Sequence, residues 1–299
     1  MPDALPARPF GAVLTAMVTP FDARGGLDLD AAQRLAVHLV DSGNDGLVLS
    51  GTTGESPTTT DAEKDALLRA VLEAVGSRAK VLAGVGSNDT HHTVELAQQA
   101  AKSGAHGLLV VTPYYSKPPA AGLLAHFTAV ADATDLPVMV YDIPGRTAVR
   151  IGTPTLLRLA EHERIVAVKE ATGDLFEGAD VMAKTGLAYY SGDDVLNLAW
   201  LAHGAAGLVS VVGHVAGRQY ADLVAAVDGG DLARARALHA QLVPAVRAIM
   251  TRTQGAIMAK AALQLAGVLG ERTMRLPLVA ATDDEVAQLR PDLEEAGLL

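Results

Sequence analysis

The stretch IVAVKEATGD, residues 165–174, places a lysine directly after a short apolar run. Ile165 to Val168 predict a strand with apolar side chains on both faces, as in a parallel sheet that is buried by helices. Lys169 is unusual at the end of such a strand, because burying an unpaired ammonium is costly and the group tends to lose its proton instead. Two interpretations follow: Lys169 extends into water, or it is kept neutral so that it can attack a carbonyl carbon.

Seven further apolar runs have the same character, and each ends in glycine or polar residues. They occupy residues 11–20, 45–54, 79–88, 106–115, 136–145, 187–194 and 207–215. Helical patterns lie between the runs, so right-handed crossovers would make all strands parallel. Eight such units predict an α/β fold, a closed (β/α)8 TIM barrel. An open doubly wound sheet is the alternative, but the glycine-rich dinucleotide fingerprint is missing after the first strand.

Helix ends are marked by capping signals. Thr60 and Glu63 form a capping box at the start of residues 60–75, which end at Gly76, and the helix over 90–103 ends at Gly104. Pro154 stands where the first turn of a helix tolerates proline. These signals support the alternation of strands and helices along the chain.

The chain is expected to divide into three parts. Residues 1–9 predict a loose leader, and they lack the apolar segment of a signal peptide. Residues 10–230 would form the barrel. Residues 231–299 hold only helical patterns and predict a C-terminal helical extension, with helices over 231–251, 255–268 and 283–296. Pro244 should bend or split the first of these helices, and Thr282 with Glu285 predicts a capping box for the last.

Composition excludes several functional classes. The 299 residues are 49% hydrophobic and carry a formal net charge of −10, which argues against nucleic acid or an anionic membrane as a main partner. No run of 18 apolar residues is present to span a bilayer. The absence of cysteine excludes disulfides, thiolate nucleophiles and Cys-based metal sites. It also fits a reducing compartment, so we expect a cytoplasmic protein.

The strand ends test the interpretation of Lys169 independently, because active sites of such barrels lie at the C-terminal ends of the strands. These ends carry hydroxyl groups, one arginine and the lysine. The residues are Thr52, Thr53, Tyr114, Tyr115, Tyr141, Arg146, Lys169, Gly192, Asp193, Val209 and Ser210. No pair of histidines has metal-ligand spacing with a convincing third ligand, so we expect no metal site. The two acids of SGDD, residues 191–194, argue against a phosphate site after the seventh strand.

Three loop motifs each allow a functional and a purely structural interpretation. In GTTGES, residues 51–56, glycines flank two threonines, so backbone N–H groups and hydroxyls could face a carboxylate; the motif could also be a plain turn. Of the two adjacent tyrosines in TPYYSKPP, residues 112–119, only one can face the barrel mouth, and the other would point outward toward a partner subunit or pack under a loop. Arg146 in YDIPGRT, residues 141–147, can bind a carboxylate bidentately or be solvated.

Taken together, the strand ends favour Schiff-base chemistry on a keto acid. Attack by Lys169 requires a neutral amine, and lowering its pKa from about 10.4 to near 7–8 corresponds to about 4 kcal/mol of disfavoured charge. Burial in an apolar barrel can supply that free energy. A nearby tyrosine can then pass protons during carbinolamine formation and dehydration. A metal-dependent aldolase is the rival chemistry.

The motifs GTTGESPTTT, TPYYSKPP, YDIPGRT and VKEATGD, in this order and spacing, resemble the N-acetylneuraminate lyase superfamily of pyruvate-dependent class I aldolases, and within it the dihydrodipicolinate synthase family. The similarity covers about residues 10–299. The resemblance implies condensation of pyruvate with L-aspartate 4-semialdehyde and cyclisation with loss of water, the first committed step of lysine and diaminopimelate synthesis. It also implies that no cofactor is needed and that the assembly is a homotetramer, a dimer of dimers.

Roles for individual residues follow from the same resemblance. Lys169 would form the Schiff base, and Tyr141 would be the acid and base. Tyr141 would relay protons through Thr52 and Tyr115, the latter reaching the neighbouring subunit's site across a dimer interface. The substrate-binding residues would be Thr53 and the backbone of Val209 for the pyruvate carboxylate, Arg146 for the semialdehyde carboxylate, and Gly192.

Two departures from the family pattern stand out. Residues 251–260, TRTQGAIMAK, lack the Asn-Pro segment of many relatives, which affects the packing of the extension. Relatives that lysine inhibits place two histidines and an acid around an allosteric cleft. The matching positions here are Asp61, Lys64 and His92, whereas Ser56, Asn88 and Tyr114 do match. A cation at Lys64 would repel a lysine effector, so we expect weak inhibition or none.

Two other functions stay open on sequence alone. A sibling pyruvate-dependent aldolase or lyase would cleave sialic acid or a keto-deoxy sugar acid with the same lysine and anion cradle. A silent barrel would bind a keto acid as a sensor, without turnover. Arg146 and the pair of tyrosines favour the synthase over the siblings, and the intact set of catalytic positions argues against the sensor.

Overall fold

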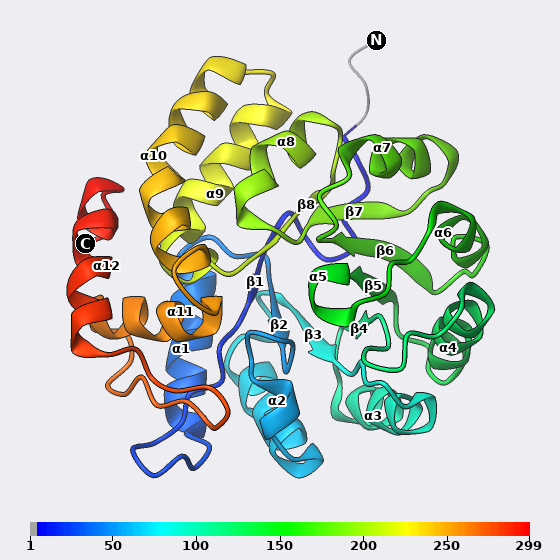
Figure 1. The fold of residues 1–299 in the computed structure, drawn as a ribbon, viewed down its shortest axis with the longest axis horizontal. Coiled ribbons are helices and arrows are strands. Elements are labelled where there is room, and N and C mark those ends of the chain that lie inside the picture. The colour runs from blue at the N-terminus through cyan, green and yellow to red at the C-terminus, as the bar shows by residue number, and fades with distance from the viewer. Residues whose placement is uncertain (1–4) are drawn as a thin grey trace.

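The computed structural model describes residues 5–299, and in these residues eight parallel strands close into a barrel in the order β1 to β8 (Figure 1). The strands are β1 Val13–Ala16, β2 Gly46–Leu49, β3 Lys80–Gly84, β4 Gly107–Val111, β5 Val138–Asp142, β6 Ile165–Glu170, β7 Ala188–Ser191 and β8 Gly207–Ser210. Each strand lies inside one of the eight apolar runs, and β8 pairs with β1 to close the sheet. The predicted TIM barrel is confirmed.

Helices cover the outside of the barrel between successive strands. Their bounds are α1 Leu29–Asp41, α2 Asp61–Val75, α3 Thr90–Ser103, α4 Ala120–Asp132, α5 Pro144–Thr147, α6 Thr153–Leu159, α7 Leu175–Lys184, α8 Asn197–Ala202 and α9 Gly213–Asp228. Short 3-10 turns occur at Ser56–Thr58 and Asp194–Leu196. Within residues 5–299, every helix is too short or too polar to traverse a bilayer.

The capping signals in the sequence mark helix ends correctly. The Thr60 side chain and Glu63 form the expected capping box of α2. The helix α3 ends at Gly104, whose φ of 91° is a left-handed conformation that glycine adopts without strain. Pro154 lies in the first turn of α6. Local polar chemistry therefore sets these boundaries before tertiary packing is considered.

The strands are buried on both faces, as the run before Lys169 predicts. Side chains that point outward pack against the helices, and a second cluster fills the interior of the barrel. At the N-terminal end of the barrel, Phe10 and Tyr190 are fully buried, and the Tyr190 hydroxyl donates to the carbonyl oxygen of Gly11 at 2.9 Å. This end is closed by packing, which leaves the C-terminal end of the strands for a site.

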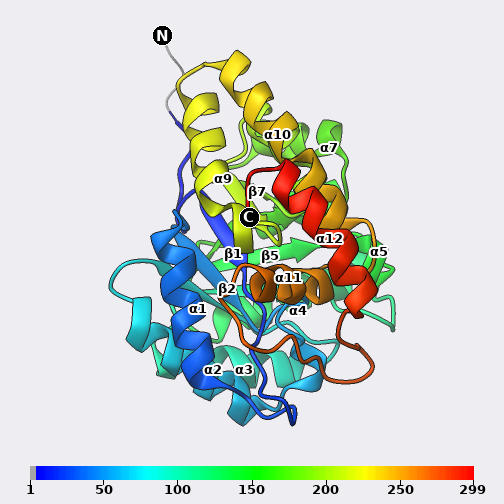
Figure 2. The same ribbon diagram turned by 90° about the vertical axis from the view of Figure 1, so that its left-hand side faces the viewer.

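Three helices follow the barrel: α10 Leu232–Met250, α11 Gly255–Leu265 and α12 Asp283–Glu295. They lie together on the flank beside α1 and α9, with α10 against α9 and α12 (Figure 2). Thr282 and Glu285 form the capping box predicted for α12. Of the two expected effects of Pro244, a bend or a split, the split does not occur, because α10 runs through this residue as one helix. The break in helical dihedral angles lies instead at Ala216 in α9.

The start of the described chain is tied to the barrel. The expected loose leader covers residues 1–9, of which residues 1–4 lie outside the described residues. Arg8 forms a bidentate ion pair with Asp228 at 2.8 Å and donates to the carbonyl oxygen of Ala206. These contacts connect the segment before β1 to the end of α9 and to the segment before β8.

Candidate active site

The centre of the site is a pair of side chains on neighbouring strands. Tyr141 of β5 and Lys169 of β6 are partners in the register of the parallel sheet. Because side chains alternate along a strand, both point into the barrel, while the next residues, Asp142 and Glu170, point outward. Nζ of Lys169 lies 4.2 Å from the ring centroid of Tyr141, and each side chain belongs to a residue that is 5% exposed. The interpretation in which Lys169 extends into water is therefore wrong.

Burial prepares the lysine to act as a nucleophile. It lowers the pKa of the Lys169 amine to about 8, with the Asp194 carboxylate acting in the opposite direction and Arg146 in the same direction. A shift of this size corresponds to about 3 kcal/mol, and it leaves roughly one amine in ten neutral at pH 7. The amine is thus available for attack without a strong base beside it.

Burial has the opposite consequence for the tyrosine. It raises the pKa of the Tyr141 phenol well above its usual value, and Arg146 only partly offsets this effect, while Asp193 adds to it. The phenol therefore keeps its proton across the physiological pH range. At rest Tyr141 is a protonated phenol whose ring lies against the amine of Lys169.

A cavity of about 190 Å³ lies at the C-terminal ends of β2 to β5; Tyr141 lines it, whereas Lys169 is not among its lining residues. Its lining includes three residues predicted for the site, Thr52, Tyr141 and Arg146, together with Tyr114. The remaining walls are glycine backbone, apolar side chains such as Leu109, and the hydroxyl residues Ser50, Ser56 and Thr147. Such a cavity is smaller than the roughly 300–1,000 Å³ of drug-sized sites, so it suits a small organic acid.

Arg146 supplies positive charge at the rim of this cavity. It lies in α5, the short helix at the barrel mouth (Figure 1), and its side chain is exposed. Across residues 5–299, its guanidinium takes part in no ion pair. A guanidinium in this position can bind a carboxylate with two parallel hydrogen bonds.

The structure places the other predicted residues as follows. Thr53 is buried in the loop after β2, and Val209 lies in the barrel interior. Gly192 packs so closely that a Cβ there would lie 3.0 Å from Cγ of Lys169 and 2.8 Å from the carbonyl oxygen of Glu170, so only glycine fits beside the lysine.

Tyr115 is the predicted catalytic residue that this chain does not bring to its own site. It is 88% exposed and adopts a φ of 73° in the loop after β4. A left-handed backbone conformation is uncommon for a tyrosine. It redirects the chain after β4, and the Tyr115 side chain is exposed to solvent in this chain. Its neighbour Tyr114 is the one of the two that lines the cavity.

Sequence reasoning missed Asp194 as a member of the site. This carboxylate is 3% exposed and accepts hydrogen bonds from Ser210, from Asn197 at 2.9 Å, and from the backbone N–H groups of Val211 and Val212 at 2.8 and 3.0 Å. It is the charge that holds the pKa of Lys169 up against burial. The sequence feature that could have identified Asp194 is the pair of acids in SGDD, residues 191–194. In residues 5–299, no group of three or more His, Cys, Asp or Glu is arranged to hold a metal ion.

The lysine pKa predicts the pH dependence of adduct formation. The rate at which Lys169 reacts with pyruvate should rise about tenfold per pH unit below pH 8 and level off above it, because only the neutral amine attacks. Arg146→Ala removes a positive charge that favours the neutral form, so it should move the midpoint to higher pH. Borohydride trapping followed by mass spectrometry measures the rate of adduct formation against pH in the native protein and in Arg146→Ala. A midpoint near 10, or no response to Arg146→Ala, would contradict the environment described for the amine.

Comparison with known proteins agrees with this geometry. The model of the family described as "Dihydrodipicolinate synthetase family" matches residues 9–296. The chain is similar to proteins named 4-hydroxy-tetrahydrodipicolinate synthase from Kineococcus radiotolerans, at 68% identity over 99% of this chain and 96% of the relative. A protein of the same name from Acidothermus cellulolyticus is 64% identical over the same shares.

Solved structures give the same result. The dihydrodipicolinate synthase of Cyanidioschyzon merolae, crystallised with lysine bound, has a TM-score of 0.94 at 42% identity and covers 98% of this chain and 100% of its own. The enzyme from Bacillus anthracis has a TM-score of 0.92 at 41% identity, with coverage of 95% and 98%. The match extends over the barrel and the C-terminal helices alike. The chain therefore belongs to the dihydrodipicolinate synthetase family.

Proposed function

We propose that the chain has 4-hydroxy-tetrahydrodipicolinate synthase activity and condenses pyruvate with L-aspartate 4-semialdehyde in lysine and diaminopimelate biosynthesis. The observation that carries this proposal is the buried amine of Lys169, 4.2 Å from the ring of Tyr141. Relatives named for this activity are 58–68% identical over nearly the whole chain. The enzyme is a lyase of the Schiff-base type, and the proposed reaction requires no cofactor.

In the first half of the reaction, the neutral amine of Lys169 attacks the keto carbon of pyruvate. A C–N bond forms, and the carbonyl oxygen takes a proton supplied by Tyr141. The resulting hydroxyl leaves as water, which gives an imine between the lysine and pyruvate. Loss of a proton from the methyl group then converts the imine into an enamine, the carbon nucleophile of the second half.

In the second half, the enamine carbon attacks the aldehyde carbon of the semialdehyde, and the aldehyde oxygen takes a proton. The amino group of the semialdehyde then attacks the imine carbon and closes the ring. Lys169 leaves as a free amine, so the enzyme is regenerated. One molecule of water is released for each pair of substrates.

The proposed roles of the remaining residues rest on their positions. Thr52 lines the cavity beside Tyr141 and would relay protons. Thr53, Gly192 and the backbone of Val209 would hold the pyruvate carboxylate. The guanidinium of Arg146, at the rim of the cavity, would bind the carboxylate of the semialdehyde.

We propose a homotetramer built as a dimer of dimers, in which Tyr115 completes the proton relay of the neighbouring subunit. Its 88% exposure and its left-handed backbone support this assignment, because a buried partner surface would explain an aromatic side chain held outside its own barrel. We also infer a cytoplasmic location from the proposed place in amino-acid biosynthesis.

A substrate comparison tests the proposed function. The chain should release cyclic product from pyruvate and aspartate semialdehyde in a coupled assay, and it should not cleave N-acetylneuraminate at a comparable rate. Borohydride reduction in the presence of pyruvate should leave a covalent adduct on Lys169. Cleavage of a sugar acid in preference to condensation would instead identify a sibling lyase, and the absence of any adduct would identify a binding protein without turnover.

Free lysine is expected to inhibit the enzyme weakly or not at all. Nζ of Lys64 is 3.8 Å from Asp61 and donates to the carbonyl oxygen of Thr59 at 2.6 Å, while His92 contacts the same aspartate at 2.9 Å. A resident ammonium repels a second one. Initial rates at millimolar lysine should match those without it, and a clear fall in rate would refute the expectation. Lys64→Gln, which removes the cation, should increase lysine binding measured by calorimetry.

A further inference from the structure

The loop that carries Thr52 and Thr53 is anchored by a buried ion pair from far along the chain. Glu55 ends this loop, and its carboxylate accepts hydrogen bonds from Nζ of Lys260 at 2.6 Å and from the backbone N–H of Arg275 at 2.9 Å. The side chains of Glu55 and Lys260 are each 1% exposed. Lys260 lies in α11, and Arg275 lies between α11 and α12. The C-terminal extension therefore holds both oxygens of this carboxylate.

Lys260 is itself fixed by further contacts. Its Nζ also donates to the carbonyl oxygen of Thr273 at 2.7 Å and lies 4.4 Å from the ring centroid of Phe21. Burial lowers the pKa of Lys260, and the carboxylate of Glu55 acts against this effect. Because apolar residues often stabilise a protein as well as a buried ion pair does, stability alone does not explain the pair. A requirement for fixed geometry explains it better.

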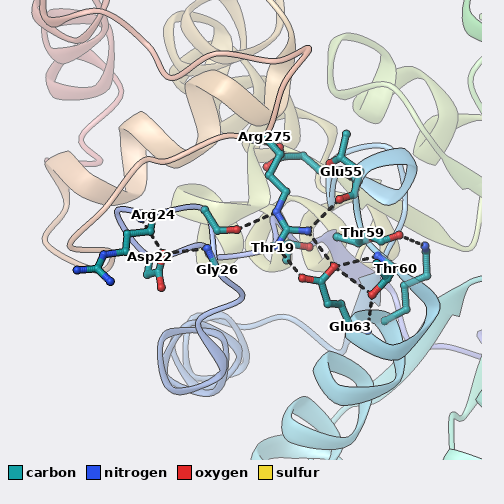
Figure 3. A network of polar contacts seen from close by, with 12 residues as sticks. Thr19, Asp22, Arg24, Gly26, Glu55, Thr59, Thr60, Glu63 and Arg275 are labelled. Atoms are coloured by element: carbon teal, nitrogen blue, oxygen red, sulfur yellow. Dashed lines mark hydrogen bonds and ion pairs between the residues drawn. The ribbon is translucent and has the colours of Figure 1, made fainter.

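Arg275 connects the same loop to neighbouring segments (Figure 3). Its guanidinium donates to both carboxylate oxygens of Glu63, at 2.6 and 2.8 Å, and to the carbonyl oxygens of Gly25 and Thr58 at 2.9 Å. The bidentate pair lowers the pKa of Glu63 to about 2. Five donors in a rigid plane fix relative positions more tightly than a flexible ammonium would. One side chain of the extension thus reaches the loop after β1, the loop after β2 and the helix α2.

The backbone of the loop needs such an anchor. Glu55 has a φ of 56°, a left-handed conformation that is unfavourable for a residue with a side chain. Strained conformations persist only where the surroundings over-determine them. On the other side, Thr19 donates to the carbonyl oxygen of Gly54 at 2.7 Å. If Glu55 lost its partners, the loop could relax and carry Thr52 and Thr53 with it.

We propose that Lys260 and Arg275 are positioning residues that act through Glu55 to hold the loop in which Thr52 relays protons and Thr53 binds the carboxylate of pyruvate. The inference rests on the proposed function of that loop. It gives the C-terminal extension a part in substrate binding as well as in packing. The proposed site for the semialdehyde is Arg146 on α5, which takes no part in the contacts of Glu55. Loss of these contacts should therefore change KM for pyruvate more than KM for the semialdehyde.

Steady-state kinetics of two variants tests the proposal. Lys260→Met leaves the carboxylate of Glu55 buried without its cation. The double variant Glu55→Gln/Lys260→Met removes both charges and so avoids an unpaired buried charge that could prevent folding. In both, kcat/KM for pyruvate should fall about 10- to 100-fold, because small displacements of binding groups have effects of that order. Displacement of Thr53 should raise KM for pyruvate, and displacement of Thr52 should lower kcat. KM for the semialdehyde should stay within about twofold of native.

Asp292→Asn is the matched control. Asp292 is a buried carboxylate whose ion-pair partners, Arg247 and Arg252, belong to the extension and the turn after α10. Its loss weakens the extension without removing a partner of Glu55, so KM for pyruvate should stay native. Native pyruvate kinetics in the double variant would overturn the proposal. An equal rise of KM for pyruvate in Asp292→Asn would also overturn it, because the rise would then reflect a general destabilisation of the C-terminal extension.

Hydrogen exchange on the native protein provides a test that depends on no variant. Amides of residues 51–56 and of α11 should lose protection together as denaturant rises, because one anchored unit opens cooperatively. Exchange of the amides in residues 51–56 while those of α11 stay protected would contradict the proposal that α11 holds this loop in place. Borohydride trapping on the native chain separates the two levels of inference. A missing pyruvate adduct refutes the proposed function, whereas a normal adduct with native kinetics for both variants refutes only the positioning role.

Discussion

Replacing Lys169 with alanine or methionine is expected to abolish condensation while the barrel stays folded. In the proposed mechanism this amine bonds to pyruvate, and no other amine shares the barrel interior with it among the described residues. Loss of a covalent nucleophile typically costs about 10⁴-fold or more in kcat. Lys169→Met is the sharper variant, because it keeps most of the side-chain volume under Tyr141. The measurements are the coupled condensation assay and borohydride trapping, which should find no adduct.

Stability provides the control for Lys169→Met. The pKa of Lys169 is lowered from 10.5 in the unfolded chain to about 8 in the folded one, so below pH 8 the folded state carries a penalty of about 3 kcal/mol for the buried charge. Between pH 8 and 10.5 the unfolded chain binds more protons, so native stability rises with pH across this window. The variant lacks the penalty. Denaturant unfolding should show it to be more stable than native at pH 7, with the difference shrinking toward pH 10.5.

Two outcomes would contradict the assignment. Substantial residual condensation by Lys169→Met would show that another group forms the covalent intermediate. Loss of activity together with loss of cooperative unfolding would show that the lysine supports the fold, which contradicts the expectation that its burial costs stability. The expected pair of results, no activity and equal or greater stability, arises only if the amine is held in the barrel for its chemistry.

Much of the fold could be predicted from the sequence because its signals are local. Each strand is a short apolar run with its own glycine or polar ending, and each capping box lies within four residues. Lys169 is conspicuous in the sequence because a charged side chain follows four apolar positions. The ends of parallel strands meet at one edge, so the sequence alone predicts that Tyr141 and Lys169 lie close together.

The remaining features depend on contacts that sequence spacing does not reveal. Glu55 and Lys260 are 205 positions apart, and only the docking of α11 on the loop after β2 brings them together. In the sequence, Asp194 is one of two adjacent acids in a turn. Its burial near Lys169 depends on the backbone N–H groups of Val211 and Val212, which precede α9 and donate to its carboxylate. Pro244 does not split its helix because packing against α9 and α12 keeps α10 continuous. Tertiary structure decides such cases over local preference.

Tyr141→Phe is expected to lower kcat by about 10²- to 10³-fold, the usual size of a lost general acid. The phenyl ring keeps the apolar packing of the phenol and its contact with Nζ of Lys169, so the substitution removes the hydroxyl and little else. Formation of the carbinolamine and expulsion of water both need a proton at the former carbonyl oxygen. The rate of adduct formation with pyruvate should therefore fall together with kcat, and stopped-flow or quenched-flow trapping with borohydride measures it.

The matched control is Tyr190→Phe, on the other strand that pairs with Lys169. Tyr190 is fully buried and lies across the register from Lys169, as Tyr141 does, but its hydroxyl faces the N-terminal end and donates to the carbonyl oxygen of Gly11. Removing that hydroxyl should cost about 1 kcal/mol of folding stability and leave kcat within a few-fold of native. Equal kinetic losses in the two variants would assign the effect to barrel packing. A large loss in Tyr141→Phe alone places the proton donor at the mouth of the barrel, against the amine it serves.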